Sequence, residues 1–320
     1  MNDSQRERGK EIHRQTGKTF YYATRLLPER IREQTYVLYG FFRIADEVVD
    51  DGADRSSDAQ RAKLEAIRAA ALGGSETEEP VVEAFSEIRE RKGISDEEVD
   101  AFIDAMIADI DRDRYETYEE LEAYMRGSAA AVGNMMTAIM DVDHPQKARP
   151  HAMALGEAFQ LSNFIRDVRE DIDDLGRVYL PLETLRRHEV TVDQLARHEV
   201  TPGFRRAIQS ELSRAEDRYR HGVEGIEYLP KDCQFAVLLS AVLYAEHHRL
   251  VRRQDFDVLS TRPSLSRSRK LRVVARTWWN WRRFGDPVTV FERVSAVPSE
   301  ESTAEETATS GPDRGVPSPD

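Results

Sequence analysis

The chain has 320 residues, of which 33% are charged and 40% hydrophobic, and its formal net charge is −13. This length is sufficient for one large helical domain or two ordinary ones. The acidic excess argues against nucleic acid as a partner, because a polyanion would be repelled. The only cysteine, Cys233, excludes an internal disulfide and a cysteine-based zinc site.

Two further properties of the composition predict where the protein works. No stretch approaches the roughly 18 consecutive apolar residues that a membrane span needs, and the polar residues 1–8 contain no apolar core of a signal peptide. We therefore expect a cytoplasmic protein. Lysine is scarce, with seven residues against 39 arginines. Because halophiles use strongly acidic surfaces to stay soluble, we expect a halophilic source.

Helical periodicity dominates the chain from residue 30 onward, and no alternation is long enough to predict a sheet. The predicted helices cover residues 30–51, 57–71, 80–92, 95–111, 117–140, 148–171, 203–228, 231–257 and 265–284. Ser95 followed by Glu98 predicts a capping box at the start of the fourth helix. We expect one all-α domain over residues 1–295. The Ser-, Thr-, Glu- and Pro-rich residues 296–320 predict a disordered acidic tail.

The first predicted helix contains an unusual acidic cluster. Asp46 and Asp50 are four residues apart and therefore share one helix face. Two like charges at this spacing repel each other and destabilise a helix by a few tenths of a kcal/mol. Arg43 precedes them, and Phe41 and Phe42 lie beside them rather than the polar residues of a solvated face. The pattern favours a cleft.

The helix predicted for residues 148–171 repeats this arrangement. Asp167 and Asp171 are again four residues apart, Arg166 comes immediately before them, and Phe164 lies nearby. Paired carboxylates suit Mg²⁺, which prefers one or two protein carboxylates together with waters and phosphate oxygens. The alternative is a pair of solvated faces, since 59 acidic residues will produce such spacings by chance. The arginines could then simply balance charge.

Small residues and histidines each allow two interpretations. The run Gly127–Gly133 could let two helices approach closely, leave room for a long apolar ligand, or do both.

The adjacent His247 and His248 could suggest a metal site. However, no Glu lies three residues before any histidine, so the Glu-x-x-His pattern of di-iron bundles is absent. We interpret both histidines as structural.

Five motifs in order resemble one family. They are Gly17-Lys18-Thr19-Phe20 followed by Leu26-Leu27-Pro28, Tyr39-x-x-x-Arg43-x-x-Asp46-x-x-x-Asp50, Tyr124 before Gly127–Gly133, Gln160-x-x-Asn163-x-x-Arg166-Asp167-x-x-x-Asp171, and Gly176-Arg177-Val178-Tyr179-Leu180-Pro181. Over roughly residues 10–285 the chain resembles the squalene/phytoene synthase family of head-to-head prenyl transferases. The resemblance implies an all-α isoprenoid-synthase bundle with a central apolar cavity.

The resemblance also implies roles for particular residues. The implied Mg²⁺ ligands, which could also hold Mn²⁺, are Asp46, Asp50, Asn163, Asp167 and Asp171. The implied diphosphate contacts are Lys18, Thr19, Arg43, Arg166 and Arg262. The residues implied to stabilise a carbocation through cation–π attraction are Tyr39, Tyr124, Tyr179 and Tyr244. Many members have Ser where this chain has Gly17, which puts a diphosphate contact at that position in doubt.

Within the family, two sequence segments resemble phytoene synthases more than squalene synthases. They are Ala45-Asp-Glu-Val-Val-Asp50 and Gly176-Arg-Val-Tyr-Leu-Pro181. We therefore expect Mg²⁺-dependent condensation of two geranylgeranyl diphosphates to phytoene through prephytoene diphosphate, without NADPH, for carotenoid biosynthesis. One alternative is a squalene-type synthase that joins two farnesyl diphosphates. An alternative of another class is a non-catalytic helical scaffold.

The segment Val258–Gly285 reverses the charge of the rest of the chain. It contains eight basic residues, no acidic residue and all three tryptophans, Trp278, Trp279 and Trp281. Basic helices that carry Trp on one face lie at membrane interfaces. We expect peripheral contact with anionic lipid through residues 262–283, with Arg262 turned toward the site. The alternative is that this helix packs on the acidic body and pairs its charges internally.

Overall fold

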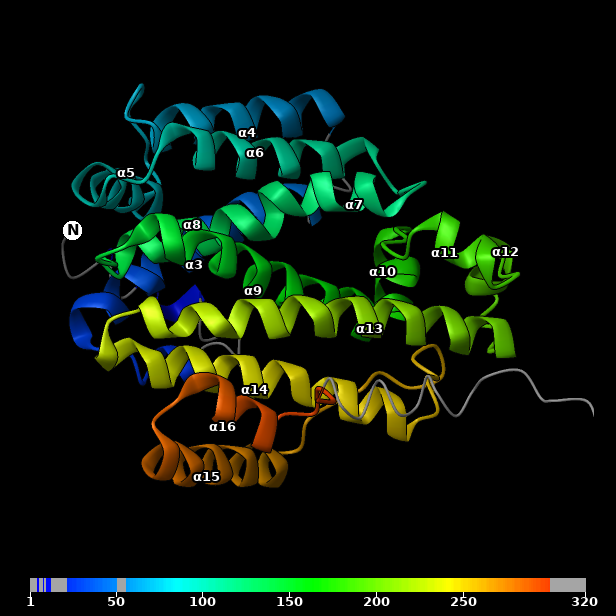
Figure 1. Cartoon of the computed structure of the whole chain (residues 1–320). Coiled ribbons are helices and arrows are strands. Elements are labelled where there is room, and N and C mark those ends of the chain that lie inside the picture. Colours follow the sequence, from blue (N-terminus) through cyan, green and yellow to red (C-terminus); the bar gives the residue numbers. More distant parts are fainter. Residues whose placement is uncertain (1–4, 6–7, 9, 13–21, 51–55, 300–320) are drawn as a thin grey trace, which may run out of the picture.

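The structure is a computed structural model that describes residues 5, 8, 10–12, 22–50 and 56–299 (Figure 1). The predictions for Lys18, Thr19 and residues 300–320 lie outside the described residues. Within the described ranges the regular structure is helical, and the only strand-like feature is a single bridge between Arg114 and Val178. The predicted all-α fold is confirmed.

The described helices follow one another through short connections. Their bounds are α3 (Glu29–Asp50), α4 (Ser57–Ala71), α5 (Pro80–Lys92), α6 (Asp96–Asp111), α7 (Tyr118–Met125), η2 (Arg126–Ala130), α8 (Ala131–Ile139), α9 (Pro145–Arg166), α10 (Val168–Leu175), α11 (Leu182–Arg187), α12 (Val192–Ala196), α13 (Pro202–Glu224), η3 (Gly225–Tyr228), α14 (Lys231–Arg253), α15 (Arg267–Phe284) and α16 (Pro287–Val294). 

Three elements were not anticipated. Helices α11 and α12, of six and five residues, are too short to show a helical period. The eight-residue α16 follows the last predicted helix and was not predicted, although its buried Val290, Phe291 and Val294 have helical spacing. Two predicted helices are also subdivided. The helix expected over 117–140 contains a five-residue π-helical segment, η2, and the helix expected over 148–171 is interrupted at Asp167.

The capping box predicted for Ser95 and Glu98 is wrong. Ser95 is the N-cap of α6, but its side chain makes no capping hydrogen bond. The carboxylate of Glu98 is instead buried and accepts hydrogen bonds from Arg126 at 2.9 Å and Asn134 at 2.7 Å. Hydrogen bonds from the distant residues Arg126 and Asn134 therefore replace the predicted capping bond of Glu98.

The long helices run roughly alongside one another in the middle of the molecule (Figure 1). Helix α9 packs against α8, α13 and α14 and is the central element. The pair α4 and α6 covers one side, whereas α15 and α16 pack together on α14 at the opposite side. Val297, at the start of the expected tail, is buried in the same apolar cluster as α16. No described helix is both long enough and apolar enough to cross a membrane.

Glycines in the small-residue run set how closely the helices approach α9 and α6. A Cβ at Gly133 would lie 2.3 Å from the carbonyl oxygen of Ala152 in α9. A Cβ at Gly127 would lie 2.1 Å from the carbonyl oxygen of Ala101 in α6. Both distances are far inside van der Waals contact, so only glycine allows these backbones to approach so closely.

Candidate functional site

An apolar cavity of about 260 Å³ lies among α3, α8, α9, α13 and α14. The small-residue run contributes Ser128, Ala129, Val132 and Gly133 to its wall. The run therefore serves both purposes considered above, since it allows close helix packing and also leaves space for a ligand. The predicted central apolar cavity is confirmed.

The first acidic cluster lies on α3 and surrounds one arginine. Arg43 is paired with Asp46, and its guanidinium lies 3.3 Å from Glu47 and 3.9 Å from Asp50. Desolvation of the Asp46 carboxyl by the surrounding protein, followed by repulsion from Asp50, raises the pKa of Asp46 to about 7. The charge of Arg43 opposes this rise, and a further cation beside Asp46 would lower its pKa in the same way.

The second acidic cluster lies at the junction of α9 and α10. Asp167 is the residue between the two helices, and the Asp171 N–H donates to its carbonyl at 2.9 Å, so the two residues keep their one-turn spacing. Asp167 accepts hydrogen bonds from Arg166 at 2.7 Å and Arg262 at 2.8 Å. Burial, followed by repulsion from Asp167, raises the pKa of Asp171 to about 8.

Arg262 is turned toward this cluster, as expected from the sequence. Besides Asp167, its guanidinium donates to Glu170 at 2.8 Å. Asn163 lies one turn before Asp167 on α9, and its carbonyl accepts from the Asp167 N–H at 2.9 Å. The structure thus brings the implied diphosphate contacts Arg166 and Arg262 onto Asp167, with the Asn163 backbone one turn before it.

Arg177 connects the two clusters and was not among the predicted site residues. Its guanidinium lies 3.4 Å from Asp50 and donates to the Asp109 carbonyl at 2.9 Å. Its backbone N–H donates to the Asp171 carbonyl at 2.8 Å. The available signal was its place in the motif Gly176–Pro181, directly after the second acidic cluster.

Asp109 is a second functional candidate that the sequence did not indicate. It is a buried residue of α6 and accepts a hydrogen bond from the Tyr124 hydroxyl at 2.7 Å, with the Tyr179 hydroxyl at 3.5 Å. Burial raises the pKa of Asp109 to about 6, although the bond from Tyr124 and the charge of Arg177 oppose this shift. No pattern distinguished it from the other acidic residues of its helix.

The four predicted tyrosines form two groups. Tyr39 and Tyr244 line the cavity, and Tyr244 stacks on Phe159 with ring centroids 4.6 Å apart. Tyr124 and Tyr179 are outside the residues that line it and lie at Asp109 instead.

The second group of tyrosines is part of a continuous aromatic stack. The Tyr179 ring is stacked on Phe164, with centroids 4.2 Å apart, and lies 5.9 Å from Tyr124. Tyr115 continues the stack at 5.3 Å from Tyr124. Desolvation raises the pKa of both Tyr124 and Tyr179 well above 10, so both hydroxyls stay protonated and can donate hydrogen bonds.

The structural interpretation of the adjacent histidines is confirmed. His248 is buried and lies within hydrogen-bonding distance of Ser162 at 2.8 Å and Glu216 at 3.1 Å. Burial, followed by the charge of Arg166, lowers the pKa of His247 to about 3, so its ring is neutral. Neither ring takes part in the acidic clusters.

The residues of the two clusters fit divalent cations that are shared with a phosphorylated ligand. Their donors are hard oxygens, which Mg²⁺ prefers. Burial and like-charge repulsion raise the pKa values of Asp46 and Asp171, and a cation bound beside these carboxylates would favour their ionised form. Among the described residues, no three of these carboxylates lie within 4.8 Å of one another. Water or the oxygens of a phosphorylated ligand would complete the coordination of a cation held by one or two of these carboxylates.

Comparison with known proteins agrees with this geometry. The profile of the squalene/phytoene synthase family matches residues 13–269. The chain belongs to this family. Its relatives include a phytoene synthase of Thermus thermophilus, 34% identical and aligned over 77% of this chain and 83% of the relative.

Further relatives support the same assignment. A phytoene synthase of Rhodobacter capsulatus is 32% identical, over 84% of this chain and 79% of the relative. Among solved structures, a dehydrosqualene synthase in complex with a ligand superposes with a TM-score of 0.80 at 26% identity, over 88% of this chain and 98% of that structure. The family member described here therefore has the isoprenoid-synthase fold and is an enzyme of the prenyl transferase type.

Proposed function

We propose that this family member is a phytoene synthase, which condenses two molecules of geranylgeranyl diphosphate head to head. The reaction would pass through prephytoene diphosphate and release diphosphate. The observation that carries the proposal is the pair of arginine-bearing acidic clusters connected by Arg177, together with an apolar cavity lined by Tyr39 and Tyr244. Relatives named phytoene synthase, about 30% identical over most of the chain, support the choice of product.

The polar residues would bind and orient the diphosphate groups. Arg43, Arg166 and Arg262 already pair with the acidic clusters, and Arg166 does so through two N–H groups on the same carboxylate of Asp167. Each guanidinium could exchange a carboxylate oxygen for a diphosphate oxygen, which the planar fork of arginine can bind in bidentate geometry. Lys18 and Thr19 are proposed as further contacts on the strength of the motif alone. Stabilising the charge of a departing diphosphate is the principal task of such a site.

The proposed metal ligands are Asp46, Asp50, Asn163, Asp167 and Asp171. Mg²⁺ bound there, or Mn²⁺ in its place, would supply electrophilic neutralisation of the diphosphate. The carbocation would lie in the apolar cavity, where the rings of Tyr39 and Tyr244 can face it. Tyr124 and Tyr179 would contribute from the neighbouring aromatic stack.

A squalene-type synthase that joins two farnesyl diphosphates is the second candidate. It is favoured by the superposition on a dehydrosqualene synthase at a TM-score of 0.80. Separate incubations with C15 and C20 diphosphates, each with and without NADPH, distinguish the candidates. We expect a C40 product from the C20 substrate that does not require NADPH. A C30 product alone would contradict the proposal. No product from either substrate, with or without added Mg²⁺, would indicate a scaffold.

We further propose that helix α15 binds anionic lipid surfaces. Leu271, Trp278 and Trp279 have exposed fractions of 70%, 49% and 67%. Arg272 and Arg282 are exposed on the same helix, which offers positive charge to lipid head groups. The alternative, in which the helix pairs its charges with acidic residues of the protein, applies to part of α15, because Arg269 donates to the buried Glu246 at 2.7 Å.

Co-sedimentation with vesicles tests this contact. Replacing Trp278 and Trp279 together by Ala should weaken binding to vesicles that contain anionic lipid. Replacing Tyr22 and Leu26 by Ala is the matched control, because both side chains are also exposed but lie elsewhere on the chain. Trp281 is left intact because it packs against Phe235 at 6.1 Å. Equal binding of the two double variants would contradict the contact.

A further inference from the structure

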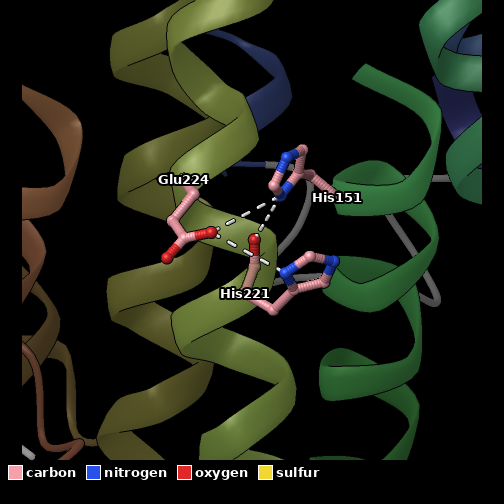
Figure 2. Close-up of side chains that lie close together, drawn as sticks. All are labelled: His151, His221 and Glu224. Atoms are coloured by element: carbon pink, nitrogen blue, oxygen red, sulfur yellow. Dashed lines mark hydrogen bonds and ion pairs between the residues drawn. The ribbon is translucent and has the colours of Figure 1, made fainter. Parts of the chain in front are cut away.

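A group of metal-ligating side chains lies between α9 and α13, outside the acidic clusters (Figure 2). His151 comes from α9, whereas His221 and Glu224 come from the last turn of α13. One ring nitrogen of each histidine and one carboxylate oxygen of Glu224 all lie within 4.8 Å of one another. Elsewhere in the described ranges, no three His, Cys, Asp or Glu residues come this close.

The distances are close to those of a coordination sphere. The Glu224 Oε2 atom lies 3.9 Å from His151 Nδ1 and 3.7 Å from His221 Nδ1. Tetrahedral zinc with bonds of about 2.0–2.1 Å places its ligand atoms roughly 3.4 Å apart. Small rotations of the side chains would close the difference. His221 and Glu224 are three residues apart and therefore point from the same face of α13.

The surroundings of this group favour a cation. The His221 carbonyl lies 2.6 Å from His151 Nδ1, and it belongs to the C-terminal turn of a 23-residue helix. The C-terminal end of a helix carries partial negative charge. Both the carbonyl and the Glu224 carboxylate only accept hydrogen bonds. His151 Nδ1 therefore carries its proton toward them. A metal ion would replace this proton after a small rotation of the ring away from the carbonyl, because the 2.6 Å gap is too short to hold an ion bonded at about 2.0 Å.

We propose that His151, His221 and Glu224 bind a divalent transition-metal ion of the zinc type. Two imidazoles with one carboxylate suit Zn²⁺, Co²⁺ or Ni²⁺, whereas Mg²⁺ prefers oxygen ligands alone. Three protein ligands leave a fourth position for water. The ion can enter from solvent, because the His221 and Glu224 side chains are 49% and 58% exposed.

The proposed ion would tie together two helices that form the wall of the apolar cavity. Ala152 and Leu155, which flank His151 on α9, line this cavity, and so do Gly222 and Gly225 beside His221 and Glu224. The His151 side chain packs closely against the end of α13. A Cβ added at Gly225 would lie only 2.1 Å from the Cβ of His151. Metal binding to the folded chain alone should therefore raise its thermal stability.

Titration calorimetry of the full-length, untagged chain with ZnCl₂ tests the site. Excess Mg²⁺ in the buffer would compete with Zn²⁺ for the carboxylates of the acidic clusters, which the proposed function assigns to Mg²⁺. We expect one Zn²⁺ per chain, and we expect His221→Gln and Glu224→Gln each to weaken binding at least about tenfold. These positions are at the surface, so the variants should fold. His144→Ala is the control, because it removes an exposed histidine near the start of the same α9.

Two further measurements distinguish the proposed site from binding elsewhere. Zn²⁺ should raise the midpoint temperature of the wild type and the His144→Ala control, but not that of the His221→Gln variant. Affinity should fall as pH decreases, because a protonated imidazole cannot bind metal. A wild type that binds no Zn²⁺, or variants that bind it as tightly as the wild type, would overturn the proposal.

Discussion

Arg177 illustrates how single residues join the two halves of the site. Its guanidinium contacts Asp50, and its charge opposes the rise in the pKa of both Asp46 and Asp171. Its backbone N–H closes the C-terminal end of α10 by donating to the Asp171 carbonyl. Burial by itself lowers the pKa of Arg177. Its interactions with Tyr179, Asp109 and Asp50 outweigh this effect and raise the pKa above the usual arginine range. The positive charge between the clusters is therefore permanent.

Replacement of Arg177 by Ala should lower kcat/KM by about 10²–10³-fold, the usual cost of removing one charge-stabilising donor. Steady-state kinetics with the C20 diphosphate measure this effect. Arg186→Ala is the matched control, since Arg186 is exposed and pairs only at the surface with Glu116. Similar activity of the two variants would show that Arg177 has no role in the reaction.

The acidic clusters themselves should matter for turnover but not for folding. Asp46→Ala and Asp171→Ala should each abolish product formation while leaving the helical circular dichroism signal unchanged. Above pH 8, where both carboxyls are ionised, each substitution removes like-charge repulsion, so the metal-free variants should be slightly more stable, by roughly 0.2–0.5 kcal/mol. Activity within a few-fold of wild type in both variants would remove these residues from the site.

Asp109 should make stability depend on pH. Its pKa is raised from 3.8 to about 6 by burial, so the folded chain binds this proton more tightly than the unfolded chain. The stabilising contribution is complete below pH 4 and is lost as pH rises through 6. Asp109→Asn should therefore gain stability relative to wild type between pH 4 and 7, by on the order of 2 kcal/mol. Urea unfolding at several pH values tests this, and a pH-independent difference would contradict it.

At the scale of elements, α9 determines the geometry of both the cavity and the second cluster. Its neighbour α8 approaches closely at Gly133, and its C-terminal end at Arg166 leads directly into Asp167. The interruption at Asp167 separates α10 from α9 without changing the one-turn spacing of the aspartates. The π-helical segment η2 lies beside it, and such segments often occur at functional sites.

The close approach of α8 and α9 should be sensitive to one methyl group. Gly133→Ala would place a Cβ 2.3 Å from the Ala152 carbonyl oxygen, so the helices must separate, at a cost of about 1–3 kcal/mol. Chemical denaturation measures this loss. Ser128→Ala is the control, because Ser128 lines the same cavity and its buried hydroxyl makes no hydrogen bond within the described part of the chain. Equal stability of both variants would contradict the packing argument.

At the scale of the whole molecule, charge is distributed unevenly. The chain carries a net charge of −13, yet α15 contains basic residues and no acidic one. Salt screens repulsion between acidic groups at the surface. We expect the midpoint temperature of unfolding to rise with KCl concentration and folding to weaken in dilute buffer, as in a halophilic protein. Full stability in dilute buffer would contradict this expectation.

The sequence by itself predicted most of the helices and both acidic clusters, because helical period and i, i+4 spacing are local properties of the chain. Ordered motifs were enough to indicate the family and the expected fold. Short helices such as α11 and α12 were missed because five or six residues show no period. The capping box at Ser95 failed because distant Arg126 and Asn134 compete for Glu98.

Only the tertiary structure decided which distant residues meet. Asp109 on α6 joins Tyr124 and Tyr179, and the Arg177 guanidinium reaches Asp50, through contacts that span up to 127 residues. The raised pKa values of the aspartates likewise depend on burial, which a linear pattern does not report. Burial and long-range electrostatics arise only when helices pack, so the chain's local patterns could indicate its chemistry but not the full set of residues that would carry it out.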